Sequence, residues 1–413
     1  MMTSAKSIQF YTTRRLALIW FLACQNYSAE TARPFESGPL DPLRLTAAAT
    51  QAGFKVRELK ADIPVAVRSH VPFVAAAYTD EPLATLRHQY PLNKVVAGGR
   101  DEWQSQLLLK EWVHKAIPPG SPKVSYNNAL EILEHAARGA TFWCTHYTIT
   151  YAECAAALGW QARKIGVDRK HGPEGMGSSH HGVAEVWSNQ FRKWVVIDAQ
   201  SNLHFEKAGI PLSAWEIRAE WLKDGGKSVD HVVGVPPKAV KKNPAIVWWD
   251  RAEDETSVYF WMYLESRLMA AKGSDVPQQL IFPQDEANTH LVWYQNGDPE
   301  SKGSELHQGY LRNRFLPTQR IEDVYWTVGI VESTLTGLQQ GAIQLRLDSF
   351  SPNRVGYQVS LDGSSWLSVK NEKSVEWPLK ANWNSLRLRT LSEGNVTGPE
   401  TSVLMLLEPA GKD

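Results

Sequence analysis

Three side chains that can together perform nucleophilic catalysis lie in one stretch of the chain: Cys144, His181 and Asp198. A cysteine attacks a carbonyl carbon as a thiolate, and a helix N-terminus beside a histidine favours that form through the helix dipole and the imidazolium charge. The histidine accepts the thiol proton, and a carboxylate fixes the tautomer of its ring. The chemistry of such a set is acyl transfer or amide cleavage through a thioester.

Cys144 stands where a helix is predicted to begin. It follows Gly139, which ends the preceding predicted helix, and leads into the strong helix-forming residues 151–158. Cys154 lies in the middle of that helix among alanines, where a small apolar side chain packs well, so we assign it to the core. Along one helix the two thiols would be about 15 Å apart, beyond the ~7 Å limit for a disulfide. The sequence therefore predicts no bridge between them.

Two strands are predicted to carry the other two side chains. Residues 182–187 and 193–198 alternate or run apolar, and the polar residues 188–190 between them predict a hairpin. His181 comes directly before the first strand and Asp198 ends the second. Adjacent strand residues point to opposite faces, so only one of His180 and His181 can face the thiol.

These blocks resemble the transglutaminase-like superfamily of papain-type cysteine enzymes. In that family a Cys opens a helix, and a Gly and an Ala-Arg pair follow it. A strand then carries His with Glu four residues later, and a second strand ends in Asp. The matching positions here are Cys144, Gly159, Ala162-Arg163, His181, Glu185 and Asp198. The position of Glu185 selects His181, and not His180, as the base.

The resemblance implies an α+β fold with a papain-like core, in which the helix bearing Cys144 packs on an antiparallel sheet bearing His181 and Asp198. It implies oxyanion stabilisation by the Cys144 backbone N–H and a second donor upstream. Trp112 is a candidate for that donor, and the alternative is that its ring only fills a helix face. The resemblance implies no cofactor. Neither His146 nor His204 has the Cys/His spacing typical of zinc, so no metal is expected.

Two functions from different classes fit the motifs. The first is an enzyme acting on a peptide, protein or glycopeptide substrate, and the intact Cys, His and Asp favour it. The second is a degenerate module that binds a glycan or a protein partner. Val183 stands where the family usually has Trp, Trp160-Gln161 replaces the usual Ile-Pro, and the chain has 17 Trp. These features keep the binding alternative open.

The N-terminus predicts an export signal over residues 1–29, and hence an extracytoplasmic location: periplasmic, secreted or lipid-anchored. Two arginines precede the apolar run 16–23, which is too short to span a bilayer. The sequence Leu22-Ala23-Cys24 is similar to the end of a lipoprotein signal, in which Cys24 would be acylated. Ordinary cleavage near residues 28–29 is an equal alternative. Contact with a membrane is expected only through such a lipid.

Length and charge limit the remaining possibilities. A chain of 413 residues exceeds one hydrophobic core. Lys plus Arg and Asp plus Glu balance at 44 each, which disfavours nucleic acid as a partner. Short alternating strands near the C-terminus are typical of an immunoglobulin or fibronectin sandwich. After the signal, the predicted segments are a transglutaminase-like domain (30–240), an aromatic-rich connecting segment of uncertain assignment (241–320) and a β-sandwich (321–413).

Overall fold

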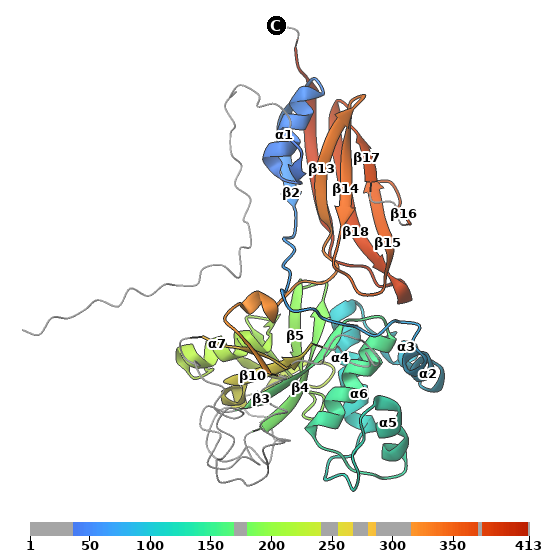
Figure 1. Ribbon diagram of the computed structural model, residues 1–413, viewed down its shortest axis with the longest axis vertical. Helices are drawn as coiled ribbons and strands as arrows, with labels where there is room; N and C mark the ends of the chain where they lie inside the picture. Colours follow the sequence, from blue (N-terminus) through green and yellow to red (C-terminus); the bar gives the residue numbers. More distant parts are fainter. Residues whose placement is uncertain are drawn as a thin grey trace, which may run out of the picture.

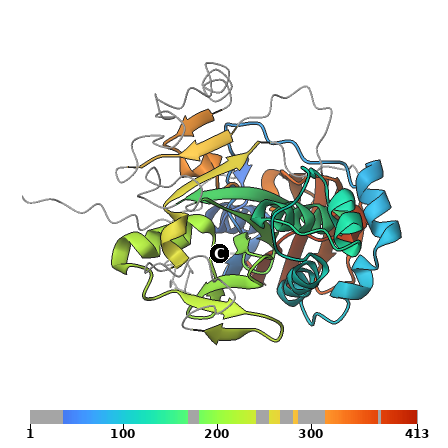
Figure 2. The same ribbon diagram turned by 90° about the horizontal axis from the view of Figure 1, so that it is seen from below.

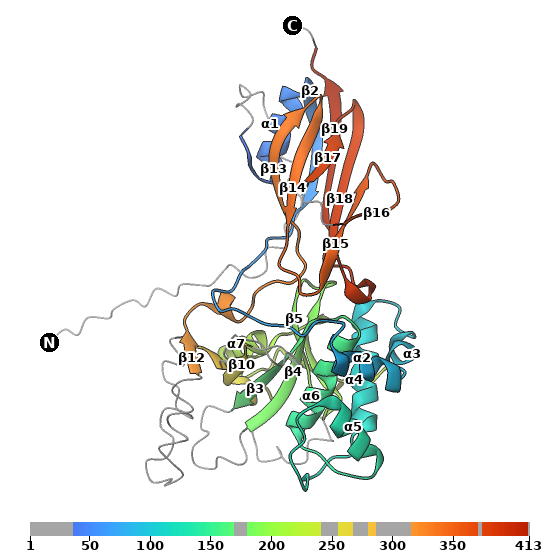
Figure 3. The same ribbon diagram turned by 45° about the vertical axis from the view of Figure 1, so that its right-hand side comes forward.

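The computed structural model has two domains stacked along its long axis (Figures 1 and 3). It describes residues 36–168, 180–240, 255–266, 280–285, 315–370 and 374–411. Helices and antiparallel sheets occur together, so the predicted α+β class is confirmed. Among the described helices none is long and apolar enough to cross a membrane. The predicted signal, with Cys24, lies outside the described residues.

The lower domain in Figure 1, here called the α/β domain, contains the helices α2 to α6, the last of which begins at Cys144. Two of these helices begin at side-chain caps: Asp101 accepts from the Gln104 N–H, and Asn128 accepts from the Glu131 N–H. The helix that starts at Cys144 is buried on nearly every face. The helices of this layer are α2 (Glu81–Gln89), α3 (Leu92–Val96), α4 (Glu102–Ala116), α5 (Ala129–Ala137) and α6 (Cys144–Ala157).

A six-stranded sheet in the order β12-β11-β10-β3-β4-β5 forms the centre of this domain. Side chains alternate between two cores: Ala184 and Val186 of β4 face α6, whereas Val183 faces the core that includes α7. Figure 2 shows α2 to α6 on one side of the sheet and α7 on the other. The elements are β3 (Ala162–Asp168), β4 (His180–Ser188), β5 (Lys193–Ile197), β10 (Trp261–Glu265), β11 (Leu280–Pro283), β12 (Phe315–Thr318) and α7 (Ala214–Asp224).

A second, small sheet follows directly after Asp198. Its order is β7-β6-β8-β9, and β6 begins at Leu203, which pairs with Asp198 through two backbone hydrogen bonds of 2.9 and 2.8 Å. The sheet thus starts at the turn that carries the predicted catalytic carboxylate. Its strands are β6 (Leu203–Lys207), β7 (Ile210–Pro211), β8 (Asp230–Val233) and β9 (Lys238–Val240).

The upper domain, here called the β-domain, consists of two antiparallel sheets that face each other across one apolar core. Their orders are β1-β13-β14-β17 and β16-β15-β18-β19-β2. Helix α1 (Pro42–Gln51) packs against the same core. The strands are β1 (Gly38–Pro39), β2 (Phe54–Asp62), β13 (Glu332–Gln339), β14 (Ala342–Asp348), β15 (Arg354–Leu361), β16 (Leu367–Val369), β17 (Ser374–Pro378), β18 (Asn382–Ser392) and β19 (Thr401–Pro409).

The β-domain is built from two distant segments, which differs from the predicted boundaries of 30–240 and 321–413. Strand β2 pairs with β19 from Phe54 opposite Pro409 to Asp62 opposite Ser402, and β1 pairs with β13. Residues 38–62 therefore belong with the C-terminal strands. Alternation of apolar residues along a strand shows which of its faces is buried but does not identify the neighbouring strand. The pairing of residues 38–62 with the C-terminal strands therefore could not be predicted from the local sequence.

The described part of the segment 241–320 completes the α/β domain. Strand β10 pairs with β3 over Leu264 opposite Ile165 and neighbouring residues, and β11 and β12 extend the sheet beyond it. The sequence prediction left this segment unassigned. Met262, Leu264 and Ile281 are buried in the core on the α7 side of the sheet, which accounts for part of its apolar composition.

Aromatic side chains join the two domains. Trp326 is buried, and its ring centroid lies 5.0 Å from that of Trp194 in β5 and 5.2 Å from that of Phe350, which follows β14. The Trp194 indole donates to the Trp326 carbonyl over 2.8 Å. An ion pair between Arg192 and Asp62 adds a polar contact at the rim. The two domains therefore pack against each other through side chains, in addition to being joined by the backbone.

Candidate functional site

The structure brings Cys144, His181 and Asp198 together at the start of α6. Nε2 of His181 lies 2.9 Å from Oδ2 of Asp198, and the side chain of Cys144 is hydrogen-bonded to His181. Because Nε2 faces the carboxylate, Nδ1 is the ring nitrogen left for the thiol. Each side chain comes from a different element: α6, β4 and the turn after β5. The order thiol, imidazole, carboxylate is the one that activates a cysteine nucleophile.

The three groups differ in exposure. His181 and Asp198 are buried, whereas Cys144 is partly exposed. Of the three residues, Cys144 is therefore the one that offers surface to solvent, while the base behind it is shielded from water. Cys154 is fully buried, and burial, together with the nearby Glu153 charge, raises the pKa of its thiol. Neither cysteine is in a disulfide within the described structure.

The pKa values of the buried pair favour two opposite charges. Burial alone would lower the pKa of His181, but the charge and hydrogen bond of Asp198, followed by those of Cys144, raise it to about 10. For Asp198 burial acts upward, yet the His181 charge and the hydrogen bonds from His181 and Ser201 leave its pKa below the usual range. At neutral pH an imidazolium therefore lies between a carboxylate and the sulfur.

Backbone contacts hold the nucleophile's helix start in place. The loop at residues 118–121 lies beside the residues that precede Cys144, because the Gly120 N–H donates to the Phe142 carbonyl and the Phe142 N–H donates to the Pro118 carbonyl, both over 3.0 Å. Gly120 has φ +148°, and a Cβ there would come within 2.7 Å of Thr141. Glycine is required at this close approach. On the other side, Gly182 of β4 lies against Thr145 of the first helical turn.

Trp143, directly before the nucleophile, is a residue that the sequence analysis did not single out. Its side chain is 50 % exposed, and its indole N–H donates to Oγ of Ser121 over 3.2 Å. Tryptophan is enriched at interfaces, where its ring is apolar and its N–H has a polar partner. The available signal was its position at the predicted helix start, next to Cys144.

Trp112, the predicted second oxyanion donor, lies on the helical side of the domain. Its ring packs edge-on against Tyr90 with centroids 6.0 Å apart, and it adjoins the helical core. His146 is buried, with its ring centroid 5.1 Å from that of Phe142, and burial lowers the pKa of its imidazole. The described residues contain no group of metal-ligating side chains.

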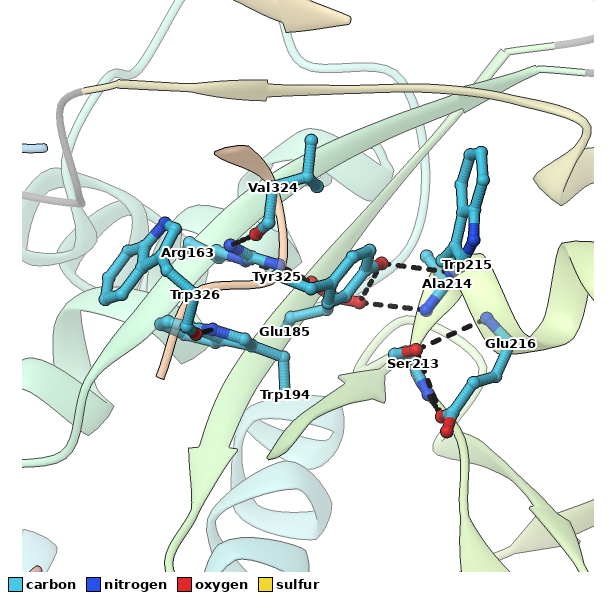
Figure 4. A network of polar contacts seen from close by, with 10 residues as sticks. All are labelled: Arg163, Glu185, Trp194, Ser213, Ala214, Trp215, Glu216, Val324, Tyr325 and Trp326. Atoms are coloured by element: carbon cyan, nitrogen blue, oxygen red, sulfur yellow. Dashed lines mark hydrogen bonds and ion pairs between the residues drawn. The ribbon is translucent and has the colours of Figure 1, made fainter. Parts of the chain in front are cut away.

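Glu185 entered the sequence analysis only as a spacing marker, and the structure gives it a structural role (Figure 4). One carboxylate oxygen accepts from Nε of Arg163 over 2.9 Å. The other accepts from the Tyr325 hydroxyl over 2.9 Å and from the Ala214 N–H over 2.8 Å. The Arg163 guanidinium also lies 4.1 Å from the Trp194 ring centroid. This buried network joins β3, β4, β5, the start of α7 and the chain entering the β-domain.

Comparison with known proteins adds little to this geometry. No protein-family model matches the chain, and no curated protein matches it. The crystal structure of red sea bream transglutaminase aligns over 79 % of this chain and 72 % of that chain, with 10 % identity and a TM-score of 0.25.

Proposed function

We propose that this chain is a transglutaminase-like cysteine enzyme that performs acyl transfer or amide hydrolysis through a thioester at Cys144. The observation that carries the proposal is the hydrogen-bonded series from the partly exposed Cys144 through His181 to Asp198. A structural cysteine has no need of a buried imidazolium–carboxylate pair behind it. Burying two charges costs free energy unless each is well paired, so the arrangement favours a chemical role.

The geometry supports a two-stage mechanism. The Cys144 thiolate attacks the carbonyl carbon of an amide, and the positive end of α6 stabilises the oxyanion through the Cys144 backbone N–H. The His181 imidazolium donates its proton to the departing amine, leaving an acyl thioester. Water or a second amine then attacks the thioester as His181 accepts its proton, and collapse of the tetrahedral adduct breaks the C–S bond. This step releases the acid or the new amide and restores the Cys144 thiolate beside the His181 imidazolium. Asp198 stabilises the imidazolium and fixes its orientation throughout.

The proposed substrates are peptides, proteins or glycopeptides that present a carboxamide or peptide bond. The proposed location is extracytoplasmic, with a lipid anchor at Cys24 or ordinary signal cleavage as the two alternatives. These proposals derive from the motifs and the N-terminal sequence.

Alkylation by iodoacetamide at graded pH, followed by peptide mapping, tests the proposal. We expect Cys144 to be modified with a midpoint well below the ~8.5 of an ordinary thiol, because the helix start and His181 both favour the thiolate. Cys154 is the internal control and should react only after unfolding, since it is fully buried. Equal alkylation rates at the two thiols, or a midpoint at Cys144 equal to that of an ordinary thiol, would refute the proposed enzymatic function.

The same pair predicts how turnover depends on pH once a substrate is found. The pKa of His181 is raised to about 10, so its proton is present at neutral pH and is lost as pH rises through that value. Turnover should therefore fall near pH 10, because the leaving amine has no acid. Alkylation of Cys144 needs only the thiolate and should stay fast there.

The binding module stays as a second candidate because of Trp143. The half-exposed indole of this residue, which directly precedes Cys144 in the chain, could contact a glycan or protein without catalysis. An ordinary alkylation profile at Cys144 in the folded protein would favour this candidate over the enzyme.

A further inference from the structure

Helix α4 contacts the turn that carries Asp198 through three side chains. Lys110 donates from Nζ to the Asn202 carbonyl over 2.9 Å. Nδ1 of His114 lies 3.2 Å from the Ala199 carbonyl and 3.0 Å from the Gln200 carbonyl. Glu111, between them in sequence, accepts from the Asn202 side-chain amide. Every residue of the turn from 199 to 202, apart from Ser201, is thus hydrogen-bonded to a side chain of α4.

Ser201 holds the carboxylate directly, because its backbone N–H donates to Oδ1 of Asp198 over 3.1 Å. The turn is short, and Asn202 adopts φ +52°, a left-handed conformation that non-glycine residues seldom adopt. Its carbonyl also accepts from the Gly234 N–H over 3.1 Å. The position of the Asp198 carboxylate therefore depends on a turn that other elements hold in an uncommon conformation.

Lys110 is an unusual residue for such a contact, because its side chain is fully buried. Burial of an ammonium group is costly, and an apolar residue at this helix position would avoid that cost. Nζ also lies 3.4 Å from Nδ1 of His204 in β6. Burial lowers the pKa of Lys110 to about 7, and the charges that oppose this are Glu111, Asp198 and Glu206. The triad carboxylate is thus among the partners of this cation.

We propose that the buried side of α4, through Lys110 and His114, positions Asp198 for the reaction. The inference rests on the proposed function and extends it to residues outside the triad. Both are positioning residues, acting on His181 and Cys144 only through the turn and its carboxylate. A shift of the carboxylate of about 1 Å is enough to cost catalysis heavily.

The test measures the alkylation profile of Cys144 in Lys110→Met, which keeps the length of the side chain and removes its charge and donor. We expect the midpoint to move upward and the rate at neutral pH to fall about tenfold, because a displaced Asp198 no longer supports the imidazolium. Gln106→Met is the matched control. Gln106 is also fully buried on α4, one turn earlier, but it bonds to the Trp187 carbonyl over 3.0 Å instead. Its profile should not change.

His114→Ala provides a second variant if Lys110→Met does not fold, because His114 is only partly buried. It should move the midpoint in the same direction by a smaller amount. An unchanged profile in a folded Lys110→Met or His114→Ala protein would overturn the inference, as would an equal shift in Gln106→Met. An ordinary profile in the unmodified protein would instead refute the proposed function, so the two failures are distinguishable.

Discussion

The two domains differ in what they bury. Among the described residues, the β-domain buries apolar side chains and uncharged polar ones such as Asn384 and Thr401, whereas the α/β domain buries charged ones. The buried charged residues are Lys110, Glu153, Arg163, Glu185, Asp198, Arg218 and Asp323, and His181 is buried as well. Because an unpaired buried charge costs several kcal/mol, each charged group must be offset by specific partners. The α/β domain is therefore the part whose interior depends on exact polar geometry.

The buried charges of the α/β domain fall into two kinds. The Arg163–Glu185 network ends on backbone and aromatic groups inside the protein. The His181–Asp198 pair instead ends at a partly exposed thiol. The first arrangement can only join elements, while the second can act on a molecule from outside. Burial of charge alone therefore does not distinguish the two, and the partly exposed Cys144 at the end of the second series is what favours the proposed catalytic role.

The largest effect should come from breaking the buried ion pair. In Arg163→Met, Glu185 is left buried without its cation, and we expect a loss of about 3–5 kcal/mol in the free energy of unfolding. Arg387→Met is the matched variant in the β-domain, where Arg387 and Glu400 pair over 2.6 Å at the surface. Its loss should be about 1 kcal/mol or less. Denaturant unfolding of both variants measures the difference, and equal losses would contradict the comparison.

The next effect concerns activity and not stability. Asp198→Asn should keep the fold but lower turnover about a hundredfold or more, because an amide can stabilise the wrong tautomer of His181 and carries no charge. Asp323→Asn is the control: Asp323 is also buried, but it accepts from the His70 N–H and the Thr318 hydroxyl over 2.8 Å each, away from the triad. Turnover and melting temperature are measured on the same preparations. Unchanged turnover in folded Asp198→Asn would remove Asp198 from the site.

The sequence predicted the parts of the site that depend on local pattern. A helix start at Cys144 follows from the preceding glycine and the alanine-rich run, and the strands after it follow from their apolar alternation. Lys110 could not be predicted, because a lysine in an amphipathic helix normally marks the solvent side. The pairing of β2 with β19 was also hidden, since it joins residues far apart in the chain. The sequence therefore did not reveal which residues distant in the chain lie next to each other in the fold.

The smallest predicted effect compares two tryptophans of similar exposure, one in each domain. Trp143 is 50 % exposed beside the nucleophile, and Trp383 is 41 % exposed on β18. If the indole of Trp143 contacts the substrate, Trp143→Ala should slow modification of Cys144 by an aromatic chloromethyl ketone about tenfold, the size of one lost aromatic contact of ~1.4 kcal/mol. Trp383→Ala should not change that rate. Iodoacetamide is too small to use the ring, so its rate at Cys144 should stay the same in both variants. If Trp143→Ala slows modification by both reagents, the ring supports the start of the helix and does not contact the substrate. If Trp143→Ala and Trp383→Ala react with the aromatic reagent at equal rates, Trp143 is excluded from the binding surface.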